Sequence, residues 1–139
     1  MESGYKVEQI SVGMKASMSK TIGESDIYGF AGITGDFNPI HVNEEYARTT
    51  RFGRRVAHGM ILAGMFSAVR AMKVPGPGGV LISQTLTFKA PAFIGDTVTA
   101  LVEVTSVNVE KNRIVMRNEI RNQDGVLLIE GESISSPRK

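Results

Sequence analysis

Residues 59–72 read GMILAGMFSAVRAM, and this stretch decides the fold. It is long enough for a helix, and up to Val69 its apolar residues cover nearly the whole circumference instead of one stripe. Such a helix must be buried, because a surface helix shows a polar face. A strongly curved antiparallel sheet around a central helix supplies apolar neighbours on most sides, and the helix in turn covers the apolar face of the sheet.

The rest of the chain fits this arrangement. Residues 24–33 and 44–49 have helical patterns, whereas the segments after the central helix alternate apolar and polar residues or are rich in Val, Ile and Thr. The expected strands are residues 80–89, 97–109, 113–121 and 126–134, and the expected turns are Gly95-Asp96, Lys111-Asn112 and Asp124-Gly125. We therefore predict an α+β fold with one domain over residues 1–139, a curved antiparallel β-sheet wrapped around a central buried α-helix.

Composition narrows the range of functions. The chain is 42% hydrophobic and 22% charged, as in globular proteins, and no apolar stretch approaches the roughly 18 residues that span a bilayer. The first ten residues lack a signal-peptide pattern, so we expect a cytoplasmic protein without a membrane partner. It has no cysteine and only two histidines, His41 and His58, which argues against Cys-based zinc sites and favours metal-free chemistry.

A basic cluster lies in the run RTTRFGRR, although the net charge is only +2. Its arginines are Arg48, Arg51, Arg54 and Arg55. Guanidinium groups at this density can bind phosphate oxygens, but they can equally form a solvated turn or a salt-bridge patch between subunits. No nucleic-acid-binding motif accompanies the cluster, so nucleic acid is not an expected partner.

The chemistry concentrates in GDFNPIH, residues 35–41. Pro39 prevents a helix from running straight through this segment, so the side chains of Asp36 and His41 can converge. A carboxylate beside an imidazole can take a proton from water and deliver one to carbon near neutral pH, as adding water to an alkene conjugated to a carbonyl requires. The structural alternative is that Asp36 caps a turn and His41 is a core residue.

Two further features lie on the central helix. Gly59 stands at its start, where free N–H groups and the helix dipole suit an oxyanion and the missing side chain lets a carbonyl approach. Alternatively, Gly59 only avoids a steric clash where the loop becomes the helix. His58 is expected at the surface or behind the site. Ser67 can hydrogen-bond the substrate or the Asp/His pair, or only its own i−4 carbonyl.

The motifs GDFNPIH, FGRRVAHGMILAGMFSAV and FKAPAFIGDTV together resemble the MaoC-like dehydratases, specifically the (R)-specific enoyl-CoA hydratases of the hot-dog fold. The resemblance covers roughly residues 17–134. It implies that Asp36 and His41 are the catalytic pair, that Gly59 is the oxyanion donor, that Ser67 lies near the active site and that Asn38 orders the turn. It also implies an acyl-CoA thioester substrate, no cofactor beyond the CoA of that substrate, and a homodimer or dimer-based hexamer whose sheets join.

The expected reaction is reversible hydration of a trans-2-enoyl-CoA, with crotonyl-CoA as the default substrate and an (R)-3-hydroxyacyl-CoA product. Arg54 and Arg55 are the expected contacts to the CoA phosphates. Two competing functions stay open: a hot-dog thioesterase, which would release free thiol, and a non-catalytic acyl-CoA-binding protein, which would have little need for an acid/base pair.

Overall fold

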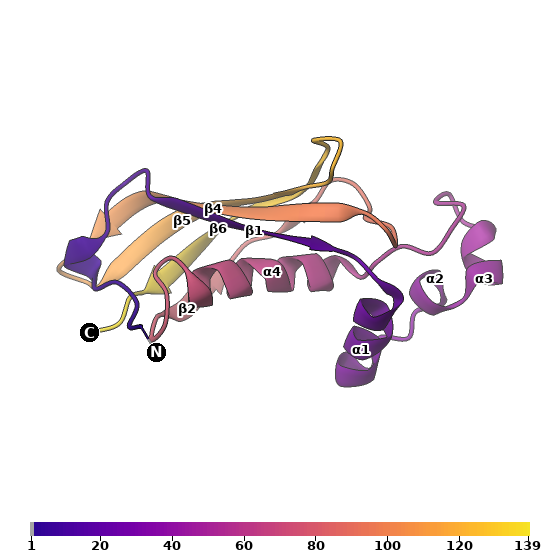
Figure 1. Ribbon diagram of the computed structural model, residues 1–139, viewed down its shortest axis with the longest axis horizontal. Helices are drawn as coiled ribbons and strands as arrows, with labels where there is room; N and C mark the ends of the chain where they lie inside the picture. The colour runs from indigo at the N-terminus through magenta and orange to yellow at the C-terminus, as the bar shows by residue number, and fades with distance from the viewer. Residues whose placement is uncertain (1) are drawn as a thin grey trace.

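The computed structural model describes residues 2–139, and its strands form one antiparallel sheet (Figure 1). The strands lie in the order β1 (Lys15–Thr21), β4 (Thr97–Asn108), β5 (Arg113–Arg121), β6 (Leu127–Ser136) and β2 (Val80–Gln84), and β3 (Thr87–Phe88) also pairs with β6. The helical elements are η1 (Val7–Gln9), α1 (Glu24–Thr34), α2 (Pro39–Val42), α3 (Glu44–Arg48) and α4 (Gly59–Met72).

The core lies between α4 and one face of the sheet. Leu62, Phe66 and Val69 recur at helical spacing on α4 and are at most 2% exposed. They belong to the same apolar cluster as the inward-facing residues of β4, whose burial alternates along the strand. Burying such a side chain contributes about 1.5–3 kcal/mol. The predicted pairing of an apolar helix with an antiparallel sheet is therefore confirmed.

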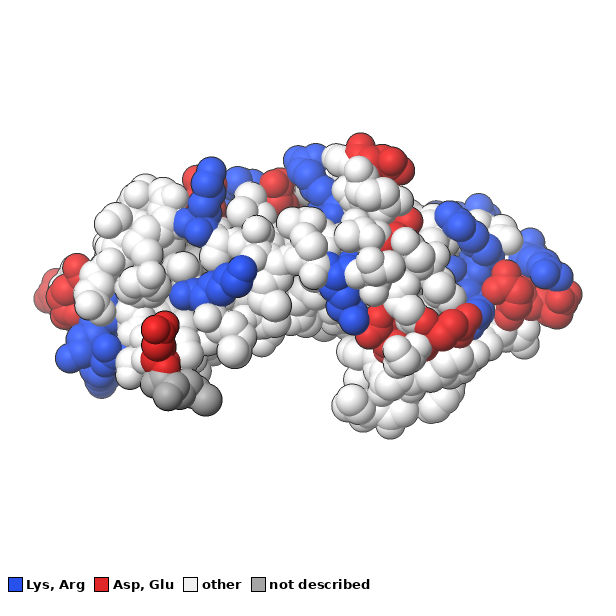
Figure 2. All heavy atoms as spheres, viewed as in Figure 1, with Lys and Arg blue, Asp and Glu red and all other residues white. Residues whose placement is uncertain are grey.

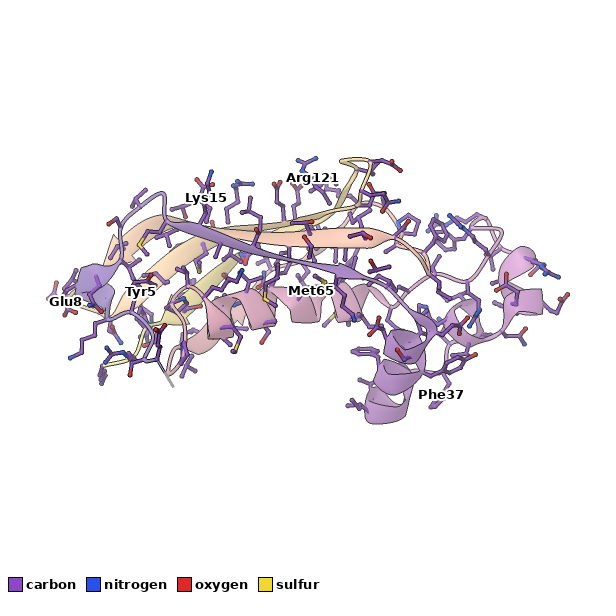
Figure 3. The ribbon with its side chains drawn as sticks, viewed as in Figure 1. Tyr5, Glu8, Lys15, Phe37, Met65 and Arg121 are labelled. Atoms are coloured by element: carbon purple, nitrogen blue, oxygen red, sulfur yellow. The ribbon has the colours of Figure 1, made fainter. Side chains whose placement is uncertain are left out.

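The outer side of α4 differs from the prediction. Met60, Gly64, Ser67 and Ala71 are exposed, because within one chain the sheet covers only one side of the helix. Met65 lies between the helix and the sheet in Figure 3, whereas the underside along α4 in Figure 2 is hollowed and carries few charged side chains. An apolar helix face without a covering layer is thus left open.

The strand expected over residues 80–89 is divided into β2 and β3. At the break, the Thr85 carbonyl lies so close to Gly131 of β6 that an added Cβ would meet it at 1.9 Å. Thr85 Oγ1 also accepts the Glu132 N–H at 3.0 Å, which replaces a regular ladder bond. Strand β1, whose sequence KASMSKT is mostly polar and small, was not predicted at all.

The segment between β1 and α4, residues 24–58, forms an overhang that extends beyond the end of the sheet (Figure 1). It contains α1, α2 and α3, and exposed Phe37 lies at its lower end in Figure 3. None of the described helices, over residues 2–139, is both long and apolar enough to cross a bilayer. The overhang is the part of the fold that carries GDFNPIH.

Candidate active site

The Asp36 loop is held by its own side chains. Helix α1 ends at Thr34, and its C-cap Gly35 adopts a left-handed conformation with φ 82° that a glycine accommodates without strain. Asp36 Oδ1 accepts the Asn38 N–H at 3.2 Å, and Asn38 Oδ1 accepts the Ile40 N–H at 3.3 Å. Asn38 is therefore the N-cap of α2, as expected of a residue that orders the turn, and Pro39 takes the first helical position, where its missing N–H costs nothing.

This turn places His41 in the interior while Asp36 stays exposed. The His41 side chain is on α2 and is 7% exposed, and its Nδ1 lies 2.7 Å from the Val56 carbonyl oxygen. A neutral imidazole that donates from Nδ1 to this carbonyl leaves Nε2 free to accept a proton. The pKa of His41 is lowered from its ordinary value of 6.5, mainly by burial and to a smaller extent by the neighbouring His58. The hydrogen bond to the Val56 carbonyl and the charge of Asp36 act in the opposite direction but do not offset this decrease.

His58 takes part in the site more closely than the sequence indicated. It is 2% exposed, its ring stacks on His41 with centroids 3.8 Å apart, and its Nε2 donates to the Asp36 backbone carbonyl at 2.9 Å. His58 therefore does not lie at the surface, which was one of its two expected positions. It lies behind Asp36 and His41, which was the other. The only hint in the sequence was that His58 directly precedes the apolar helix.

Asp36, His41 and His58 have potential ligand atoms within 4.8 Å of one another. Two imidazoles and a carboxylate can hold a divalent metal ion. Here one nitrogen of each ring is already engaged with a backbone carbonyl, and the stacked rings are only 27° from parallel. The lone pairs of a ring lie in its plane, so nearly parallel rings do not aim their remaining nitrogens at one point. This geometry suits proton transfer better than metal coordination.

A cavity of about 270 Å³ opens beside the pair. His41 and Gly59 line it, together with Leu62, Phe88 and Ile129, so its wall is mostly apolar. Gly59 is the first residue of α4, and within residues 2–139 its N–H has no hydrogen-bond acceptor. An added Cβ at Gly59 would lie 2.5 Å from Phe88 Cε1, so the backbone is open to the cavity only because the residue is glycine. An apolar cavity with one free N–H and one imidazole can bind and polarise a small acyl group.

The arginines of the cluster have different environments. Arg55 is 13% exposed in its side chain, pairs with Glu24 of α1 and lies 2.9 Å from Glu44 of α3, and its pKa is raised first by the hydrogen bond to Glu24. This is a brace within the overhang, and it leaves Arg55 poorly placed to bind phosphate. Exposed Arg54 lies over the Phe93 ring at 3.8 Å and forms no ion pair with the described residues.

Arg51, which belongs to the basic cluster named from the sequence, lines the cavity, and so does Lys89, which the sequence did not single out. Arg51 packs over the Phe52 ring, and Lys89 pairs with Glu130 at 3.3 Å. Ser67, by contrast, does not line the cavity beside His41, and neither does Asp36, although Asp36 lies close to His41. Ser67 lies eight residues along α4 from Gly59, on the exposed side of the helix, beside a second and smaller cavity.

Comparisons with known proteins agree with this fold. The family description "MaoC like domain" matches residues 6–125. The (R)-specific enoyl-CoA hydratase of Rhodospirillum rubrum is 52% identical over 126 residues, covering 91% of this chain and 87% of that protein. The 3-hydroxybutyryl-CoA dehydratase of Methylorubrum extorquens is 46% identical over 133 residues, covering 95% of this chain and 84% of that protein.

Among solved structures, the (R)-hydratase of Aeromonas caviae superposes on this chain with a TM-score of 0.90 and is 40% identical to it. The superposition covers 93% of this chain and 98% of the hydratase chain. The expected hot-dog architecture and the expected family are thus confirmed together. The chain belongs to the MaoC-like dehydratase family of hydro-lyases.

Proposed function

We propose that this chain catalyses the reversible addition of water to a trans-2-enoyl-CoA, giving an (R)-3-hydroxyacyl-CoA. The observation that carries the proposal is the apolar cavity with the His41 ring and the free Gly59 N–H in its wall, and with Asp36 close to His41. The relatives named as an (R)-specific enoyl-CoA hydratase and a 3-hydroxybutyryl-CoA dehydratase support the same substrate class. Crotonyl-CoA is the first substrate to test.

The geometry supports one role for each group in the proposed reaction. The Gly59 N–H donates to the thioester carbonyl oxygen, which gains charge as water attacks, and one such donor is typically worth roughly 10²-fold in rate. The Asp36 carboxylate and His41 Nε2 hold the water between them. His41 is neutral because its pKa is lowered, so it accepts the proton as the oxygen attacks the β-carbon. The Asp36/His41 pair then delivers one proton to the α-carbon and is restored to its starting state, so that H and OH have added across the double bond.

The CoA phosphates need cations at the mouth of the cavity. Arg51 and Lys89 line the cavity, and exposed Arg54 stacks on nearby Phe93, whereas Arg55 is occupied by Glu24 and Glu44. We therefore transfer the phosphate-binding role expected for Arg54 and Arg55 to Arg51, Arg54 and Lys89.

The open side of α4 and the sheet edge support a homodimer. Strand β2 ends the sheet, and its Val80, Leu81 and Ile82 are 59%, 44% and 51% exposed. An apolar edge strand with unpaired backbone groups is a template for pairing, and a second copy of this chain, with its own β2 and α4, covers both features at once. Light scattering during gel filtration should give twice the chain mass of 15.1 kDa, or six times for a trimer of dimers.

The deciding experiment follows the loss of enoyl-thioester absorbance when the protein meets crotonyl-CoA, with a thiol reagent in a parallel sample. Hydration removes the absorbance without free thiol, and Asp36→Asn and His41→Ala should each reduce turnover by roughly 10² to 10⁴-fold with an unchanged circular dichroism spectrum. Free thiol in step with absorbance loss would instead indicate a thioesterase. Binding without turnover would indicate an acyl-CoA-binding protein.

The one-domain organisation over residues 1–139 and the cytoplasmic location stay predictions.

A further inference from the structure

One arginine of the basic cluster lies over the ring of a phenylalanine from another part of the chain. The guanidinium carbon of Arg54 is 3.8 Å from the centroid of the Phe93 ring, whereas that of Arg51 is 4.8 Å from the Phe52 ring. Arg54 is exposed, and across residues 2–139 it forms no ion pair. Phe93 therefore covers one side of the guanidinium, and the other side is left to solvent.

The backbone holds both members of this stack in place. Val56, two residues after Arg54, forms an isolated antiparallel bridge with Phe93. The loop before Arg54 turns at Gly53, whose φ is 71° and whose N–H donates to the Thr50 carbonyl at 3.1 Å. The stack therefore joins two segments that the fold has already fixed relative to each other, so the planar group is presented in one place.

The stack adjoins the proposed active-site cavity. Ala92 lines the cavity and directly precedes Phe93, and Arg51 lines it and belongs to the same loop as Arg54. The cavity measures about 270 Å³, whereas pockets that enclose a drug-sized ligand have roughly 300–1,000 Å³. It has room for an acyl group and part of the pantetheine arm, but not for a nucleotide as well. The nucleotide of a CoA thioester must therefore lie against the surface around the cavity.

We propose that Arg54, backed by Phe93, is a stacking platform for the adenine ring of the CoA substrate. The inference rests on the proposed hydratase function and adds a contact to the base, whereas the cations named above contact phosphates. A guanidinium is planar and weakly hydrated, and nucleic-acid bases stack on it. Because Phe93 already holds the group, little side-chain freedom is lost when the base stacks on the open side. The N–H edge of Arg54 stays available to a phosphate oxygen.

The test compares crotonyl-CoA with crotonyl-pantetheine, which has the same reacting atoms but no nucleotide. Arg54→Lys keeps the positive charge and loses the planar group, so KM for crotonyl-CoA should rise roughly 5- to 20-fold at unchanged kcat. Kinetics on crotonyl-pantetheine should stay within about twofold of the wild type, because no base is present. Arg48→Lys is the matched control, since Arg48 is exposed in the same cluster and pairs with Glu45, and it should change neither KM.

An unchanged KM for crotonyl-CoA in Arg54→Lys would overturn the proposal. A KM raised equally for both thioesters would do the same, because Arg54 would then act within the cavity.

An NMR titration makes the test independent of turnover. AMP should bind the wild type several-fold more tightly than ribose 5-phosphate, which has the same phosphate but no base, and Arg54→Lys should remove most of that difference. Equal binding of the two would overturn the proposal, because only the phosphate would then be recognised. If neither thioester is hydrated, the proposed hydratase function fails, and the AMP titration still decides whether Arg54 carries a base.

Discussion

The imidazole rings of His41 and His58 stack with their centroids 3.8 Å apart. His58 also donates to the backbone carbonyl of Asp36, so one buried side chain touches both members of the proposed acid/base pair. We therefore regard His58 as a positioning residue whose effect on His41 can be measured.

His58→Phe should keep a ring against His41 but remove the donor to Asp36. We expect turnover to fall on the order of 10- to 100-fold, because the loop that carries Asp36 loses its tether. His58 lowers the pKa of His41, so the acid limb of the kcat/KM profile should move to higher pH. Asp36→Asn should move that limb to lower pH, since Asp36 raises the same pKa. A purely structural role would lower activity without moving the limb.

Stability should depend on pH through His41. Its pKa in the folded protein lies below 6.5, so the unfolded chain binds more protons in the window just below that value. The stability that neutral His41 contributes to the folded protein is fully present above pH 6.5, and it is lost as the pH falls through the pKa of His41 in the folded protein. Melting temperatures from pH 7.5 to 5.5 should therefore decrease more in the wild type than in His41→Gln. Parallel curves would contradict the buried, neutral imidazole. The lowered pKa values of Glu24 and Asp26 act at lower pH and do not interfere.

The arginine cluster should divide into two functions. Arg55→Met should reduce the free energy of unfolding by about 1–2 kcal/mol, because Glu24 and Glu44 lose a shared partner but are themselves about half exposed. Arg51→Ala with Arg54→Ala should instead raise KM for the CoA substrate while changing kcat little. Denaturant unfolding and steady-state kinetics on both variants test the division. A raised KM in Arg55→Met with unchanged stability would reverse it.

Gly59→Ala should damage catalysis more than folding. The new Cβ would meet the Phe88 ring, and that side chain is 53% exposed and can move away. The displaced ring and the methyl group then obstruct the free N–H, so kcat/KM should fall roughly 10²-fold with a small change in melting temperature. Phe88→Ala is the control, because it removes the clash. Full activity in the double variant Gly59→Ala with Phe88→Ala would contradict this prediction, because the methyl group at residue 59 would then not hinder the approach of the carbonyl to the N–H.

Removal of metal should leave the activity unchanged. Asp36, His41 and His58 are close enough to suggest a metal site, but the ring stacking disfavours it. Prolonged dialysis against a strong chelator, followed by the crotonyl-CoA assay and elemental analysis, checks this directly. Loss of activity that returns with one divalent metal would show that these residues coordinate it.

The sequence predicted the elements whose apolar pattern is long and regular. Helix α4 and strands β4, β5 and β6 are found close to their predicted residues, because burial on one face leaves a periodic signal. Strand β1 has little such signal, and the break at Thr85 depends on the close approach of Gly131 from a distant strand. Neither could be inferred locally.

The site was predictable where the residues are neighbours in sequence. The turn around Asn38 and Pro39 follows from local backbone chemistry, whereas the pairing of Arg55 with Glu24 joins residues 31 positions apart and has no local signature. The position of Ser67 away from the cavity could not be predicted either. Its place depends on which side of α4 faces the sheet, and a helix that is apolar nearly all round does not specify that.

His58 has one more consequence, which comes from its place in the chain. Its ring holds the loop of the proton-transferring pair, and its own carbonyl carbon is bonded to the nitrogen of Gly59, the proposed oxyanion donor. The two halves of the site are therefore coupled mechanically through a single residue. A displacement of the overhang relative to the sheet would therefore act on the water-activating groups and on the carbonyl anchor through the same residue.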